Sequence, residues 1–163
     1  MRAQQLGSFG EKLAETILLT SGFINIKNLN QSHQTNFPFG DLYAERKNEN
    51  FVISVKIRNK HEANTGKLNS RYNLGRRCNE LAESAQIQLS AIPAFLAISL
   101  LPNSYSAYFA PLSILDGGRG IPMTPSAVAR YKCLANNVLH NTDISHLKNI
   151  YSLRAGIVKC KNL

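Results

Sequence analysis

The stretch that decides the fold is FVISVKIR, residues 51–58, in which apolar side chains alternate strictly with a second set of side chains. A period of two predicts a β-strand, because successive side chains of a strand point to opposite faces of the sheet. The second face would carry Val52, Ser54, Lys56 and Arg58, and a lysine in so hydrophobic a strand needs a partner or a function. The other face, which we expect to be the core, would carry Phe51, Ile53, Val55 and Ile57.

A second apolar segment, residues 37–44, precedes this strand and is joined to it by the polar turn ERKNEN. Two such segments predict a β-hairpin. If the hairpin turns symmetrically about residues 47–48, Asp41 lies opposite Ser54, with Lys56 one step along the same face. An acid and an ammonium group about 5 Å apart on a sheet can hold a divalent cation beside a charge-stabilising group.

The remaining pattern predicts alternating helices and strands. We expect a helix over residues 8–21, where Phe9, Leu13 and Ile17 recur at helical spacing, and a helix that starts at Thr124 and continues over 127–139. The order favours a mixed α/β domain with a small sheet flanked by helices. The other expected elements are strands over residues 23–29, 94–101 and 105–112, and a helix over 73–90.

Length and composition narrow the class of protein. A chain of 163 residues with 44% hydrophobic and 18% charged residues is typical of one folded domain. Its three cysteines show no C-x-x-C spacing, which favours a reducing, cytoplasmic setting. The longest apolar run, residues 94–101, is too short to span a bilayer, so we expect no membrane association.

The net charge of +9 is concentrated in two segments. Residues 56–77 hold seven basic residues against Glu62, and residues 119–163 hold seven against Asp143. Such segments suit a surface that neutralises the phosphates of a nucleic acid. The residues we expect to contact DNA are Arg58, Lys60, Lys67, Arg71, Arg76, Arg77 and Arg119.

Three short motifs, Gly10-Glu11, Phe39-Gly40-Asp41-Leu42 and the segment 52–56, together resemble the PD-(D/E)XK nuclease superfamily. That superfamily places one acid on the first helix, an Asp at a strand end, and an acid-x-Lys on the next strand. The spacing is similar to that of archaeal Holliday junction resolvases and small homing endonucleases, and the resemblance covers residues 7–60. It implies a restriction-endonuclease-like core with a central mixed sheet flanked by helices. It also implies Mg²⁺-dependent DNA hydrolysis, with Mn²⁺ able to substitute.

The resemblance also implies roles for individual residues. Asp41 would be the principal metal ligand, the backbone carbonyl of Val55 a second ligand, and Glu11 a further acid. Lys56 would position the attacking water and stabilise charge on the phosphate. The catalytic set that the resemblance implies is therefore Glu11, Asp41, Ser54 and Lys56. Ser54 departs from the family, which usually has an acid at this position. A replacement metal ligand would come from Glu80, or else from Glu83 or Glu62.

Each motif also has a purely structural interpretation. Ser8-x-x-Glu11 matches a capping box, in which the glutamate binds the backbone at the start of a helix. Asp41 alone could be a turn residue. Lys56 alone could guard a strand edge against aggregation.

The sequence therefore predicts a single nuclease domain over residues 1–163, with a catalytic core of about 7–112 and a basic extension of about 113–163. The extension favours site-specific cleavage of duplex DNA, of the homing or restriction type. The alternatives are a Holliday junction resolvase and, because of Ser54, a catalytically degenerate DNA-binding protein of the same fold. Cutting two strands needs two active sites, so we expect a homodimer or homotetramer.

Overall fold

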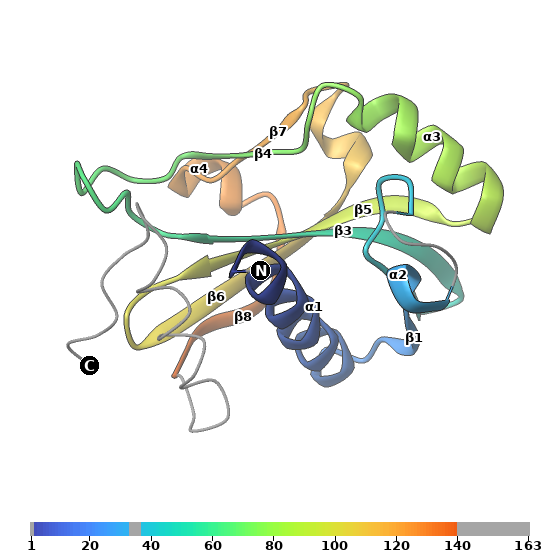
Figure 1. Ribbon diagram of the computed structural model, residues 1–163, viewed down its shortest axis with the longest axis horizontal. Helices are drawn as coiled ribbons and strands as arrows, with labels where there is room; N and C mark the ends of the chain where they lie inside the picture. Colours follow the sequence, from blue (N-terminus) through green and yellow to red (C-terminus); the bar gives the residue numbers. More distant parts are fainter. Residues whose placement is uncertain (1, 33–36, 140–163) are drawn as a thin grey trace.

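The computed structural model describes residues 2–32 and 37–139 and is built on a central sheet of six strands (Figure 1). These strands are β1 (Ile24–Asn28), β2 (Leu42–Arg46), β3 (Glu49–Asn59), β5 (Ile92–Leu100), β6 (Ser104–Pro111) and β8 (Lys132–Leu139). They lie in the order β1-β2-β3-β5-β6-β8. Only the β3–β5 pair is parallel, so the sheet is mixed, as the sequence predicts.

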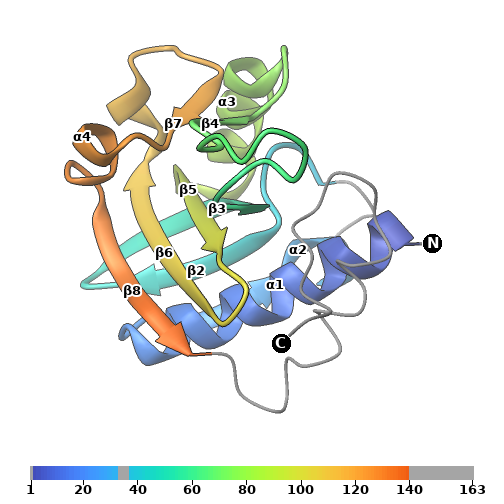
Figure 2. The ribbon, with the colours of Figure 1, turned by 90° about the vertical axis from the view of Figure 1, so that its left-hand side faces the viewer.

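Both faces of the sheet are covered. Helix α1 (Arg2–Thr20) lies along one face. Helix α3 (Cys78–Leu89), the short helix α4 (Pro125–Val128) and the ribbon of β4 (Arg71–Asn73) and β7 (Gly120–Pro122) lie on the opposite side (Figures 1 and 2). A one-turn helix, α2 (Leu29–Ser32), directly follows β1 and precedes β2. A 3₁₀ turn, η1 (Leu112–Leu115), follows β6.

This layering explains the sequence of β3. Ile53 packs in the cluster formed with α1, while Val52 packs in a separate cluster with Ala85 of α3. Both residues are fully buried, and Ser54 is 3% exposed. The strict alternation predicted the strand correctly, but the structure also buries Val52 and Ser54 on the second face, where only Arg58 is exposed.

The β2–β3 hairpin has the predicted register. Leu42 lies opposite Ile53, and the two turn residues, Lys47 and Asn48, have φ angles of 51° and 64°. Two consecutive positive φ angles are those of a type I′ turn, whose twist matches that of the flanking strands. The symmetric turn inferred from the sequence is confirmed.

The first strand of the hairpin is shorter than predicted, because it begins at Leu42 rather than at Phe37. Phe39 has a φ of 63°, and the N–H of Gly40 donates to the carbonyl of Pro38 at 2.7 Å, so the chain turns tightly here. The turn ends the extended conformation and leaves Asp41 just outside the strand.

The predicted helix over residues 127–139 is wrong beyond its first turn. Thr124 and Pro125 do start α4, but this helix ends at Val128, and residues 132–139 form β8. β8 pairs antiparallel with β6, whose outer edge would otherwise leave its backbone groups unpaired. That long-range pairing outweighs the local helical pattern.

The helix predicted over residues 73–90 begins later, at Cys78. Asn73 is instead the last residue of β4, which pairs with β7, and Gly75 turns the chain with a φ of 98°. The described part of the expected C-terminal extension, residues 113–139, supplies η1, β7, α4 and β8 to this fold. Residues 140–163 lie outside the described part of the chain. Within that part, no helix has the length and apolarity needed to cross a membrane.

Candidate active site

Asp41 is held at the start of the hairpin by three hydrogen bonds. Its backbone N–H donates to the carbonyl of Ile53 at 2.9 Å, and its carbonyl accepts the N–H of Leu29 at 3.0 Å. Its carboxylate Oδ2 accepts the N–H of Val55 at 2.8 Å. Asp41 therefore contacts the residues on either side of Ser54, and its main chain and side chain are both fixed on β3.

The carboxylate reaches Val55 because β2 is much shorter than β3. In a strand, the N–H and C=O of one residue point to the same side, and those of the next residue point to the other. Ile53 faces the β2 side, so Val55, two residues further on, faces it too, beyond the start of β2. The carbonyl of Val55 is thus presented beside the carboxylate of Asp41.

Glu11 reaches the same place from α1. The helix can approach β3 closely because residue 10 is glycine: a Cβ there would lie 2.9 Å from Cγ2 of Ile57. The carboxylate of Glu11 accepts hydrogen bonds from the side-chain amides of Asn28, at 2.9 Å, and Asn30, at 3.3 Å. The capping-box interpretation of Glu11 is wrong, because α1 begins at Arg2 and Ser8 lies in its interior.

Asn30 links the two acids, and the sequence analysis missed it. Its side chain hydrogen-bonds to Asp41 as well as to Glu11, and its Oδ1 accepts the N–H of Phe37 at 3.2 Å. These partners fix the orientation of the amide. The side chain of Asn28 in turn accepts the N–H of Asn30 at 3.0 Å. The available signal was a pair of asparagines, two residues apart, at the end of a predicted strand: Asn28 lies within the predicted strand 23–29 and Asn30 directly follows it.

The electrostatics of the site are dominated by burial. Burial, together with the negative charge of Glu11, raises the pKa of Asp41 to about 6. The Val55 N–H, Lys56 and Asn30 oppose this rise. Burial lowers the pKa of Lys56, while Asp41 raises it. The structure therefore brings Asp41, Glu11 and Lys56 within electrostatic reach of one another.

Gly40 is the second glycine that a close approach requires. A Cβ on residue 40 would overlap Cγ2 of Val52 and lie 3.2 Å from Cδ1 of Leu29. The preceding Phe39 has a positive φ, which a bulky residue adopts only at a cost in free energy. The backbone next to Asp41 is thus pressed against the sheet and strained.

The acids proposed to compensate for Ser54 do not join this group. Glu80 is exposed and forms an ion pair with Arg77 at 3.0 Å, and Arg77 is the cause of its lowered pKa. Glu83 is exposed, and Glu62 accepts a hydrogen bond from Thr65. Among the described residues, no three His, Cys, Asp or Glu side chains gather into a metal-binding group. The described acids of the site are Glu11 and Asp41.

All seven residues expected to contact DNA are exposed. Three of them, Arg71, Arg76 and Arg119, line one cavity of about 390 Å³ together with Asn73 and Gly75. The structure thus gathers arginines from β4, from the segment before α3 and from the segment before β7. None of the described carboxylates lines this cavity, so its charge suits an anion.

Comparison with known proteins identifies the fold. No family model and no curated protein matches this sequence. Among solved structures, this chain is similar to Hjc, a Holliday junction resolvase of the hyperthermophilic archaeon Archaeoglobus fulgidus. The TM-score is 0.55 at 18% identity, over 78% of this chain and 96% of that chain. The match confirms the predicted restriction-endonuclease-like fold, with its mixed central sheet flanked by helices.

Proposed function

We propose that this chain is a metal-dependent DNA endonuclease. The observation that carries the proposal is the meeting of Asp41, Glu11 and Lys56 at the open edge of β3, where the fold also presents the carbonyl of Val55. Two carboxylates and an ammonium group at one point suit hydrolysis of a phosphodiester, in which negative charge develops on the phosphate.

The donor set fits Mg²⁺. Burial and the neighbouring Glu11 both raise the pKa of Asp41, so a cation bound to the pair of acids would be stabilising. Mg²⁺ takes oxygen ligands, keeps several waters and binds through one or two carboxylates, and Mn²⁺ accepts the same ligands. Asp41, Glu11 and the Val55 carbonyl would hold the ion.

A bound Mg²⁺ supplies charge neutralisation at the phosphate and lowers the pKa of a bound water. The chain's own groups do the positioning. Val55 and Asn30 orient the Asp41 carboxylate, and Asn28 and Asn30 orient that of Glu11. Lys56 would orient the attacking water and stabilise the charge that develops on the phosphate.

Ser54 would add only a neutral hydroxyl, and the exposed Glu80 is engaged by Arg77. The proposed active site therefore rests on two carboxylates rather than three. That shortage favours the second candidate function, a DNA-binding protein of this fold without catalysis. The two functions differ in whether cleavage depends on Asp41.

DNA binding would use the exposed basic residues. The three arginines of the cavity between β4, β7 and α3 would hold phosphate groups, since guanidinium pairs with phosphate bidentately. The ribbon lies on the same side of the sheet as Lys56, because Tyr72 of β4 packs with Ala97 of β5, which is the neighbour of Lys56 in the parallel register. Arg58, Lys60, Lys67 and Arg77 would extend this surface.

Two DNA substrates are candidates. Site-specific cleavage of duplex DNA was favoured by a basic extension beyond the core, but residues 113–139 belong to the fold itself. A four-way junction is favoured by the similarity to the archaeal resolvase, which spans 96% of that protein's length. Either substrate has two strands to cut, so we propose a homodimer or homotetramer.

The decisive experiment compares the wild type with Asp41→Ala on supercoiled plasmid, linear duplex and a four-way junction. Each reaction is run with Mg²⁺, Mn²⁺ or EDTA. We expect metal-dependent cutting that the substitution abolishes, and the preferred substrate identifies the class. Salt-sensitive binding without cutting of any substrate would instead favour the binding protein.

A further inference from the structure

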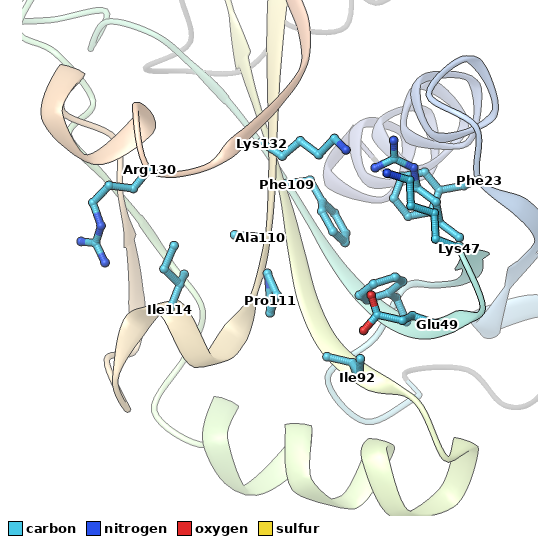
Figure 3. Close-up of a pocket in the computed structure, with 12 residues that line it drawn as sticks. Phe23, Lys47, Glu49, Ile92, Phe109, Ala110, Pro111, Ile114, Arg130 and Lys132 are labelled. Atoms are coloured by element: carbon cyan, nitrogen blue, oxygen red, sulfur yellow. The ribbon is translucent and has the colours of Figure 1, made fainter.

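A second cavity, also of about 390 Å³, lies at the end of the sheet where β2 turns into β3 (Figure 3). Its lining also comes from the start of β5, the end of β6 and the start of β8. From Glu49 at the cavity to Lys56, β3 runs seven residues, about 23 Å of extended strand. The cavity is therefore separate from the proposed active site, and no sequence motif pointed to it.

The floor of this cavity is aromatic and rigid. The rings of Phe51 and Phe23 each pack edge-on against Phe109, with centroids 5.2 Å apart in both pairs. All three rings belong to the hydrophobic core, so the floor is preformed. Ile92, Pro111 and Ile114 extend the apolar wall towards solvent.

The rim is basic. Arg46, Lys47, Arg130 and Lys132 line it, against a single acid, Glu49. The only ion pair between described residues joins Arg77 and Glu80, so none of these four cations is ion-paired with a described carboxylate. Figure 3 shows Lys132 reaching across Phe109 towards the side where Lys47 and Phe23 lie, with Arg130 apart, near Ile114. The guanidinium of Arg46 lies 5.4 Å from the centroid of Phe23.

The cations on the Lys132 side repel one another. Burial lowers the pKa of Lys132, and the charges of Arg46 and Lys47 lower it further. Such a group is stabilised when an anion binds between its members. Cavities that bind small molecules combine apolar walls with a few converging polar groups, in volumes of roughly 300–1,000 Å³. The ligand should therefore carry both an anionic group and a planar apolar body.

We infer that this cavity binds a nucleotide, with the phosphate between Arg46, Lys47 and Lys132 and the base against the apolar wall. The chemistry is the same for a free mononucleotide and for an unpaired nucleotide of a DNA strand. The inference does not rest on the proposed nuclease activity, because it requires none of the residues at the open edge of β3.

The test is a titration of the full chain with dAMP, followed through the methyl NMR signals of Ile92 and Ile114. Deoxyadenosine and inorganic phosphate serve as partial ligands. We expect dAMP to bind at least ten-fold more tightly than either part and to shift both methyl signals. Phosphate that binds as tightly as dAMP, or dAMP that leaves both signals unmoved, overturns the inference.

Charge variants locate the phosphate. R46Q and K132Q should each weaken dAMP binding at least five-fold, as should K47N, in which asparagine suits the positive φ of the turn. The matched control, K12Q, removes an exposed lysine of α1 that lines neither cavity and should leave the affinity unchanged. Three folded rim variants with wild-type affinity would overturn the inference, as would a greater effect of K12Q.

Competition then distinguishes the two sources. A single-stranded oligonucleotide that displaces dAMP from the Ile92 and Ile114 signals, where a blunt duplex does not, identifies an unpaired nucleotide of DNA as the ligand. Displacement by neither identifies a free mononucleotide. D41A should bind dAMP like the wild type, so failure of the nuclease proposal and failure of this one are distinguishable.

Discussion

The carboxylate of Asp41 accepts the backbone N–H of Val55 at 2.8 Å. It thus occupies the position at which a longer β2 would have paired with Val55. Because β2 begins only at Leu42, no described strand pairs with this side of β3 from Val55 onwards. The Val55 N–H thus fixes the carboxylate at the strand edge, and Leu29 and Asn30 of α2 add further hydrogen bonds to Asp41. The open edge and the fixed acid therefore arise from one feature, the unequal length of the two strands.

The raised pKa of Asp41 predicts how stability depends on pH. A carboxyl with a pKa of about 6 holds its proton more tightly in the native state than in the unfolded chain. Without metal, its contribution to the free energy of unfolding should therefore fall, as the pH rises from about 4 to 6, by up to about 3 kcal/mol. D41N should lack this component, and denaturant titrations of both proteins at pH 4.5 and 7.5 test the difference. Equal pH dependence would contradict the burial of a charged Asp41.

The same pKa predicts the pH profile of the reaction. The ionised carboxylate is the form that binds a cation, so the apparent affinity for Mg²⁺ should increase as the pH rises through about 6. Cleavage rates measured at several Mg²⁺ concentrations between pH 5 and 8 check this. Saturating Mg²⁺ should shift the midpoint of the rate–pH profile to lower pH. A midpoint that does not change with the Mg²⁺ concentration would assign the titration to another group.

Lys56→Ala should reduce cleavage by at least a hundred-fold and leave DNA affinity almost unchanged, because the side chain is half-buried beside Asp41 rather than on the exposed basic surface. Single-turnover rates and binding isotherms for the same DNA separate the two effects. Lys67→Ala is the matched control, since it removes an exposed lysine that lies outside β3, in the segment between β3 and β4. A proportional loss of binding in K56A would place Lys56 in DNA binding instead.

Asn30→Ala should raise the Mg²⁺ concentration needed for half-maximal cleavage more than it changes the rate at saturating Mg²⁺. Asn30 donates to both Glu11 and Asp41, so its loss leaves the two carboxylates less well oriented and raises the pKa of Asp41 further. Gln88→Ala, which removes an exposed amide bonded to Ser84 within helix α3, controls for the loss of a side-chain amide. A lower saturating rate with an unchanged Mg²⁺ requirement would count against this positioning role.

Gly40→Ala should destabilise the protein by about 1–3 kcal/mol, because the added methyl group overlaps Val52 on a buried strand. Gly10→Ala makes a useful comparison. Its methyl would meet only the Cγ2 of Ile57, and alanine favours a helix over glycine by about 0.5–1 kcal/mol, so the net change should be smaller. Denaturant titrations of the two variants should rank G40A as the less stable, and the reverse order would contradict the close approach at Gly40.

The arginine cavity predicts a salt effect. Arg71→Gln, Arg76→Gln and Arg119→Gln should each lower the slope of log K against log salt by about 1, since each removes one phosphate contact. Arg77→Gln is the control, because Arg77 already pairs with Glu80 and should release fewer counterions. Binding isotherms between 50 and 300 mM salt measure these slopes. Equal slopes for R76Q and R77Q would mean that the cavity is not the binding surface.

The sequence by itself determined the elements whose pattern is local. The alternation of residues 51–58 and the turn at Lys47 and Asn48 specify β3 and its hairpin, because side-chain periodicity and turn chemistry depend on residues close in the chain. The placement of Asp41 near Lys56 followed from that register. The fold itself was predicted from three short motifs, and the comparison with solved structures confirms it.

Only the tertiary structure decided the features that depend on distant partners. Residues 132–139 form β8 because the edge of β6 is available to pair with them, although their local pattern suggests a helix. Asn30 joins the two acids because α1, α2 and the start of β2 converge, which no spacing along the chain reveals. The basic rim around the three phenylalanines likewise forms only when the ends of β2, β6 and β8 meet. Pairing and burial between segments far apart in sequence are the interactions that local patterns do not encode.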